Sequence, residues 1–297
     1  MIELIKATEP SVVAITHTPP AQANHSPLLF RQGDDGFFRD LRGIPGNARV
    51  ETPAGAGVVI DASGLVLTQY LVVQPGQQHT IYTVDGDSYP AEIRAADPRS
   101  GLAVLDVSVE RNDLAPLPIG KAENLQKGSG VVTIGNPNAL LTDGQPTASY
   151  GTITNLARKA DPQVNLNNAK DPLRTGYRTT LHHFGALIQT DARLGWNASG
   201  GAVVNLAGEL VGITTTVSVI PGHEQSAGYA IPMNAAFRRI VDTLKEGKEV
   251  EYGLLGISFS VSARSKTTDG RYGIAVQQAY AGGPAGRAGL RSRDIIT

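Results

Sequence analysis

The stretch from Gln189 to Asn205 reads QTDARLGWNASGGAVVN, and the interpretation of the whole chain starts from it. An apolar strand pattern leads through a polar turn into Ser199-Gly200-Gly201, and a second apolar strand pattern follows. A serine before two glycines at a strand-to-strand corner can expose its hydroxyl, because glycine has no Cβ to crowd it. The same corner lets backbone N–H groups approach a bound carbonyl, as an acyl-transfer site requires. Ordinary turns also read Ser-Gly-Gly, so the flanking sequence is needed to distinguish a catalytic corner from an ordinary turn.

Composition excludes several classes of protein. Lys+Arg 26 against Asp+Glu 27 is a balanced charge, which argues against a nucleic-acid partner. With Cys 0, disulfides and thiol chemistry are excluded. No apolar run reaches the roughly 18 residues that span a bilayer, and the residues after Met1 do not have the pattern of a signal peptide. Nothing in the sequence predicts a cofactor.

Short apolar runs separated by turn residues predict an all-β chain with two six-stranded antiparallel barrels. The strands expected for the first barrel are Ser11–Ile15, Gly55–Ile60, Gly64–Tyr70, Thr80–Val84, Tyr89–Ala95 and Leu102–Val107. Those expected for the second are Gly130–Ile134, Thr147–Asn155, Ala186–Thr190, Gly201–Asn205, Glu209–Val217 and Ala227–Ile231. Apolar residues at helical spacing predict a C-terminal helix over 232–247, and Ile2–Thr8 suits a shorter one.

Several short segments, in one order along the chain, resemble the HtrA/Deg-type trypsin-like serine proteases. Gly57–Asp61 resembles that family's Gly-Val-Ile-Ile-Asp strand, Ile134–Pro137 its Ile-Gly-Asn-Pro and Tyr229–Pro232 its Phe-Ala-Ile-Pro. The flanks of Ser199 resemble the segment that carries the family's nucleophile. The resemblance implies a trypsin-like domain over residues 1–250, an extracytoplasmic location, and a homotrimer assembled through the N-terminal region.

Residues 251–297 resemble the N-terminal part of a PDZ domain, which would be incomplete here. The run from Gly283 to Thr297 is similar to the small-residue helix and the Gly-Leu-x-x-x-Asp-x-Ile segment of such domains. By the same resemblance, Leu254, Leu255, Gly256 and Ile257 form the loop that captures a C-terminal carboxylate.

The chain departs from the family where the chemistry needs a base and an acid. The family reads Leu-Thr-Asn-Asn-His-Val-Val around its base, whereas Leu67–Val73 reads LTQYLVV and puts Leu71 at the histidine's place. The acid belongs in Asp-Pro-Arg-Thr-Asp-Leu-Ala, where this chain has Gly101. Leucine cannot accept a proton, glycine cannot orient a base, and a serine hydroxyl alone is a poor nucleophile.

Two further features of the site follow from the resemblance. The oxyanion hole would use the N–H groups of Ser199 and Asn197, and Trp196 is expected to fill part of the pocket. A substrate peptide would add as a strand beside the segment that holds Ile213, Thr214 and Thr215.

The leading hypothesis is therefore a proteolytically inactive HtrA-like homologue that binds peptides or unfolded proteins as a scaffold or regulator. One alternative is an active endopeptidase of protein quality control that uses a rearranged base, such as His79 or His183. Another is a metal-binding module built on His182 and His183, although neighbours in a strand rarely point at one ion. No metal site is expected.

Overall fold

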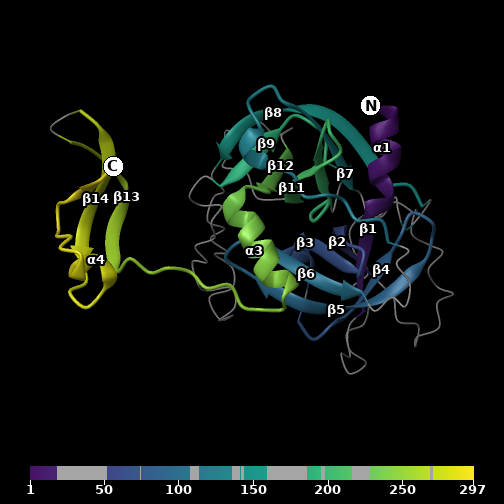
Figure 1. Ribbon diagram of the computed structural model, residues 1–297, viewed down its shortest axis with the longest axis horizontal. Helices are drawn as coiled ribbons and strands as arrows, with labels where there is room; N and C mark the ends of the chain where they lie inside the picture. Colours follow the sequence, from purple (N-terminus) through teal and green to yellow (C-terminus); the bar gives the residue numbers. More distant parts are fainter. Residues whose placement is uncertain are drawn as a thin grey trace, which may run out of the picture. The chain divides into compact units, whose positions relative to one another are not determined.

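The chain divides into two compact units, Met1–Val250 and Glu251–Thr297. The computed structural model (Figure 1) describes residues 1–18, 52–73, 75–107, 114–135, 141, 144–158, 186–194, 198–215, 228–267 and 270–297. Within this described part, no helix has the length and hydropathy needed to cross a bilayer.

The first closed barrel of the larger unit has six antiparallel strands. Its strands are β1 (Val12–Thr18), β2 (Thr52–Asp61), β3 (Leu65–Gln69), β4 (Gln78–Tyr82), β5 (Ser88–Asp97) and β6 (Leu102–Val107). They follow one another around the barrel in the order β1-β2-β3-β6-β5-β4, so β3 and β4 stand on opposite sides of the ring. Two short elements precede this barrel, the helix α1 (Ile2–Thr8) and the 3-10 turn η1 (Glu9–Ser11).

The second closed barrel also has six antiparallel strands. Its strands are β7 (Gly130–Gly135), β8 (Thr147–Arg158), β9 (Leu187–Thr190), β10 (Ala202–Asn205), β11 (Leu210–Thr215) and β12 (Gly228–Pro232). Their order around the ring is β10-β11-β12-β9-β8-β7. A 3-10 turn, η4 (Ala122–Asn124), precedes β7. The two barrels predicted from the sequence are confirmed.

Each barrel encloses its own apolar core. Ile15, Ile81 and Leu105 are fully buried inside the first barrel, and Val131 and Val203 are fully buried inside the second. Burying one such aliphatic side chain stabilises the fold by about 1.5–3 kcal/mol. The two cores therefore stabilise the closed form of each ring.

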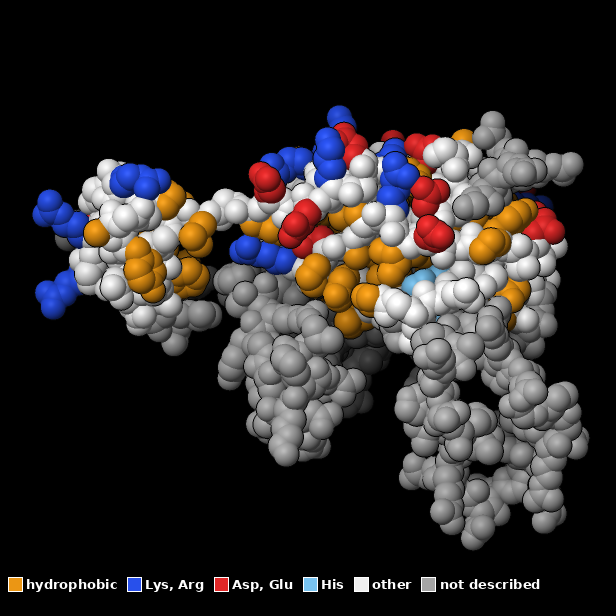
Figure 2. All heavy atoms as spheres, turned by 90° about the horizontal axis from the view of Figure 1, so that it is seen from below, with side chains coloured by type: hydrophobic (Ala, Val, Ile, Leu, Met, Phe, Trp, Pro, Cys, Tyr) orange, Lys and Arg blue, Asp and Glu red, His pale blue; other side chains and the backbone are white. Residues whose placement is uncertain are grey.

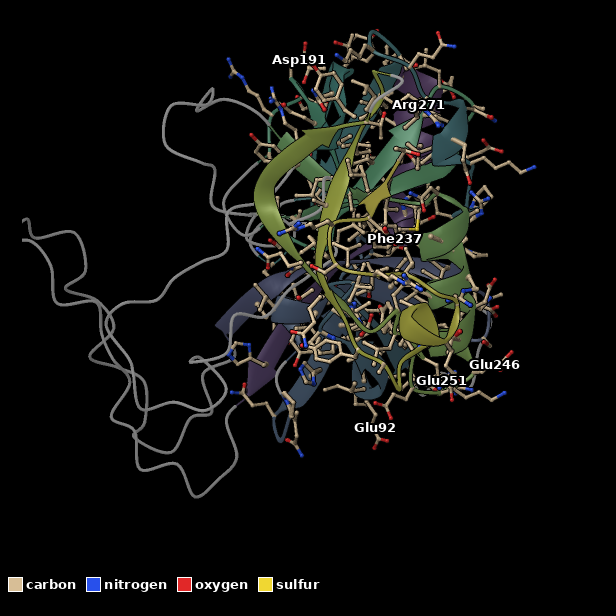
Figure 3. The ribbon with its side chains drawn as sticks, turned by 90° about the vertical axis from the view of Figure 1, so that its left-hand side faces the viewer. Glu92, Asp191, Phe237, Glu246, Glu251 and Arg271 are labelled. Carbon is tan, nitrogen blue, oxygen red and sulfur yellow. The ribbon has the colours of Figure 1, made fainter. Side chains whose placement is uncertain are left out.

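The helix α3 (Ala235–Lys245) packs across β5 and β6 (Figure 1). It begins three residues later than the 232–247 expected, because Pro232 still belongs to β12 and the Asn234 side chain caps the helix by accepting a hydrogen bond from Phe237 N at 3.1 Å. Phe237 points from the helix into the unit (Figure 3) and is 2% exposed. At the other end, Arg94 Nε of β5 donates to Lys245 O at 2.5 Å, which satisfies one of the last carbonyls.

The smaller unit has a three-stranded antiparallel sheet with the order β13-β14-β15. Its elements are β13 (Ile257–Lys266), β14 (Tyr272–Ala279), α4 (Pro284–Arg287) and β15 (Ile295–Ile296). Among the described strands β13 pairs with β14 alone, so it forms an edge of this sheet.

One strand is shorter than the sequence predicts, and the difference shapes the site. The run expected as a strand over Gly64–Tyr70 ends as β3 at Gln69, and the chain then turns through the 3-10 element η3 (Tyr70–Val72). The Gln69 side chain caps this turn by accepting a hydrogen bond from Leu71 N at 3.1 Å. Alternating apolar residues continue through the turn, so periodicity alone does not reveal it.

Candidate functional site

Ser199 lies at a tight corner just before β10, and its side chain is 8% exposed. Gly201 N donates to Ala198 O at 3.2 Å, which closes the turn around the serine. The corner is also tied to β11: Gly200 N donates to Thr214 O at 2.8 Å, and the Thr214 hydroxyl donates to Ala198 O. These bonds fix the serine backbone from two sides.

The same corner is where the second barrel meets the first. Ala56 N of β2 donates to Ser199 O at 2.8 Å, and the Thr68 hydroxyl of β3 donates to Ala56 O at 2.6 Å. Gly200 has φ +89°, and a Cβ there would collide with Ala56 O. A Cβ at Gly55 would stand 2.8 Å from Ser199 O. Both positions require glycine so that the backbones of the two barrels can approach each other.

Leu71 lies in η3, close to this corner, and presents its apolar side chain to solvent at 72% exposure. Its neighbour Val72 is buried, and the Cβ that Gly55 lacks would lie 2.5 Å from Val72 Cγ2 and 2.8 Å from Ser199 O. The turn that holds Leu71 therefore borders the serine corner.

Gly101 lies beside that turn, because Tyr70 N donates to Gly101 O at 2.7 Å. The turns that hold Leu71 and Gly101, thirty residues apart in the sequence, are thus joined through Tyr70. Gly101 has φ +75°, a conformation that L side chains adopt only with strain. The nearby Asp97 carboxylate accepts hydrogen bonds from Arg99 N at 3.2 Å and from Ser100 N at 2.9 Å. That carboxylate therefore stabilises its own turn.

Gln69 is a member of the site that the sequence did not identify. Its side chain is 6% exposed; Oε1 accepts from Leu71 N, and Nε2 donates to Thr215 Oγ1 of β11 at 3.4 Å. One carboxamide thus links the base-position turn of the first barrel to the end of a strand in the second. The two residues are separated by 146 positions, so no local pattern points to this contact.

The predicted peptide-binding edge on β11 needs a correction. Ile213 pairs with Ala202 of β10 and Ile231 of β12, and Thr214 bonds to Gly200 and Gly201. Because both edges of β11 are already paired at these two residues, neither can accept an added strand. Thr215, the last residue of β11, pairs with Tyr229 of β12 on one side.

Of the two histidines considered as alternative bases, the structure places His79 and does not describe His183. His79 lies on β4, opposite β3 in the first ring, and its ladder partners are His17 of β1 and Ala91 of β5. Its neighbours are therefore strands remote in ring order from the base-position turn. His183 and its neighbour His182 lie outside the described residues, as do Asn197 and Trp196.

No group of three or more His, Asp or Glu side chains that could hold a metal ion exists within the described residues. In the smaller unit, Leu254 and Leu255 are 79% and 60% exposed, Gly256 has φ +70°, and Ile257 begins β13. Leu255 O accepts from Ala285 N of α4 at 2.9 Å, so the predicted carboxylate loop is held against this short helix.

Comparison with known proteins agrees with this architecture. A family model described as "Trypsin-like peptidase domain" matches residues 55–213, more than half of the chain. "Periplasmic pH-dependent serine endoprotease DegQ" of Escherichia coli is 34% identical over 248 residues, which is 82% of this chain and 49% of that protein. "Protease Do-like 1, chloroplastic" of Arabidopsis thaliana is 30% identical over 291 residues, which is 98% of this chain and 57% of that protein.

A solved structure, "HtrA-type protease AlgW with decapeptide", superimposes with a TM-score of 0.66 at 26% identity, covering 99% of this chain and 84% of that one. The chain spans about half the length of the curated relatives it matches. Two barrels that meet at a Ser-Gly-Gly corner, together with these matches, place the chain in the family of HtrA/Deg-type trypsin-like serine proteases.

Proposed function

We propose that this chain is a proteolytically inactive HtrA-type homologue that binds peptides or unfolded segments as a scaffold or regulator. The observation that carries the proposal is the identity of two residues: Leu71 at the base position, and Gly101, whose carbonyl accepts from Tyr70 N, at the acid position. Removing the serine or the base from a catalytic triad costs about a millionfold in rate. The roughly thousandfold that oxyanion donors and binding retain is too little for a protease.

Peptide binding does not depend on the missing base. An extended peptide can add to an exposed strand edge through backbone hydrogen bonds, and β13 has such an edge. The exposed Leu254 and Leu255 beside the start of β13 suit an apolar C-terminal side chain next to a captured carboxylate. The relative AlgW, whose structure was solved with a decapeptide, supports the same class of ligand. On this proposal the smaller unit is part of a PDZ domain.

Proteolysis is tested with casein and with a fluorophosphonate probe that reacts with activated serines. We expect equal background cleavage by the unmodified protein and by Ser199→Ala, and no labelling of Ser199. Cleavage that survives purification and disappears in Ser199→Ala would overturn the inactive assignment and favour a rearranged base.

Binding is tested by fluorescence anisotropy with a peptide that ends in an apolar residue and its free carboxylate, against the same peptide amidated. We expect the carboxylate form to bind more tightly, and Leu255→Glu to weaken it. Leu156→Glu is the matched control, because it puts the same charge on another exposed leucine, in β8 of the larger unit. Equal binding of both peptides, or equal loss in both variants, would contradict the carboxylate loop.

We further propose that the chain forms a homotrimer through its N-terminal region and works outside the cytoplasm. Met1, the N-cap of α1, and Ile2, its first residue, are 52% and 70% exposed, and these apolar residues support an assembly surface there. The periplasmic relative DegQ supports the location. Light scattering after size-exclusion chromatography tests the trimer, and Ile2→Glu is expected to shift the mass toward the monomer; a monomeric mass for the unmodified protein would contradict it.

A further inference from the structure

Two histidines lie side by side on neighbouring strands of the first barrel. His17 of β1 and His79 of β4 are direct partners in the antiparallel ladder, and such pairs have Cβ atoms about 5 Å apart. Ile15, two residues before His17, and Ile81, two residues after His79, are also ladder partners, and both are fully buried in the barrel core. Because side chains alternate along a strand, the two imidazoles lie on the inner face as the next layer above this isoleucine pair.

The two histidines differ in their exposure to solvent. His79 is 3% exposed, and His17 is intermediate in exposure. Figure 2 shows histidine atoms at the surface of the larger unit. Solvent therefore contacts the pair mainly at His17.

The two rings are suited to act as ligands at neutral pH. Burial lowers the pKa of His17; burial and then the charge of His17 lower the pKa of His79. Neutral imidazole is the form that coordinates a metal. No carboxylate joins them to complete a three-ligand cluster in the described residues, which disfavours the oxygen-seeking ions Mg²⁺ and Ca²⁺.

We propose that His17 and His79 form a two-histidine site for a divalent transition ion such as Zn²⁺, which joins β1 to β4 at one end of the first barrel. Zn–N bonds are about 2.0–2.1 Å long, so side chains whose Cβ atoms are about 5 Å apart can both reach one ion. Water fills the remaining positions, as in open zinc sites. The proposed site does not use His182 or His183 as ligands and does not depend on proteolysis.

The direct test is isothermal titration of the full chain with ZnCl₂ at pH 7.5, with MgCl₂ as the ion control. We expect one Zn²⁺ per chain and a rise in Tm, because the ion binds the folded state alone. His17→Gln, which alters the less buried ring, should weaken binding by about tenfold or more. The double variant His182→Asn/His183→Asn is the matched control, and it should bind as the unmodified protein does.

A wild-type measurement covers the case in which a variant fails to fold. Diethylpyrocarbonate modifies accessible imidazoles, and peptide mapping after Zn²⁺ addition should show protection of His17 relative to the zinc-free protein. Loss of binding in the His182/His183 control, unchanged affinity in His17→Gln, or no protection of His17 by zinc would each overturn the proposal.

Discussion

Replacing Gly55 with alanine tests whether the two barrels close on each other at Ser199. The new methyl would stand 2.5 Å from Val72 Cγ2 and 2.8 Å from Ser199 O, both under the 3.0 Å that real Cβ atoms respect. Val72 is 2% exposed within the barrel core, and Ser199 O is already bound by Ala56 N. Neither neighbour can move aside without disturbing its own contacts.

The cost of this substitution follows from overpacking. An extra methyl in a well-packed interior destabilises a protein by about 1–3 kcal/mol. For a unit of this size, each kcal/mol lowers Tm by about 2–4 °C, so Gly55→Ala should lower it by about 2–12 °C. Urea denaturation should show a lower midpoint with an unchanged slope, because the same surface is exposed on unfolding.

Gly135→Ala is the matched control on the other side of the serine corner. Its new Cβ would lie 3.6 Å from Ala198 Cβ, an ordinary van der Waals contact, and Gly135 does not have a positive φ. We therefore expect no loss of stability beyond about 0.5 kcal/mol. A Gly55→Ala protein as stable as the unmodified one, or an equal loss in both variants, would refute the close approach of Gly55, Val72 and Ser199.

Three further predictions concern stability. Burial lowers the folded-state pKa of His17 and His79 below 6.5. Their contribution to the free energy of unfolding is therefore present above pH 6.5 and is lost as pH falls through the folded-state pKa values. Urea midpoints measured with a chelator present should fall between pH 7.5 and 5, and His79→Gln should flatten this pH profile. Gln69→Leu should lower the free energy of unfolding by about 1–3 kcal/mol, because it leaves the buried Thr215 hydroxyl without its donor, whereas adding Thr215→Val should recover part of the loss. Asn234→Ala should cost about 1 kcal/mol through the lost helix cap, and thermal melts that show no change would contradict the cap.

The sequence by itself determined most of the secondary structure. Every predicted strand of the two barrels is present, with ends displaced by a few residues, because alternation of apolar residues and turn glycines acts over short stretches of chain. The placement of Leu71 and Gly101 at the base and acid positions is a prediction that rests on their immediate neighbours in the sequence.

Only the tertiary structure decided what these residues contact. Strand closure brings Gly101 against the Leu71 turn, Gln69 against Thr215, and His17 opposite His79, although these partners are far apart in the sequence. The same closure pairs both edges of β11 at Ile213 and Thr214, which removes them as an open edge for peptide. Local patterns record which face of a strand is buried, whereas the identity of a partner across a barrel depends on the register of the whole ring.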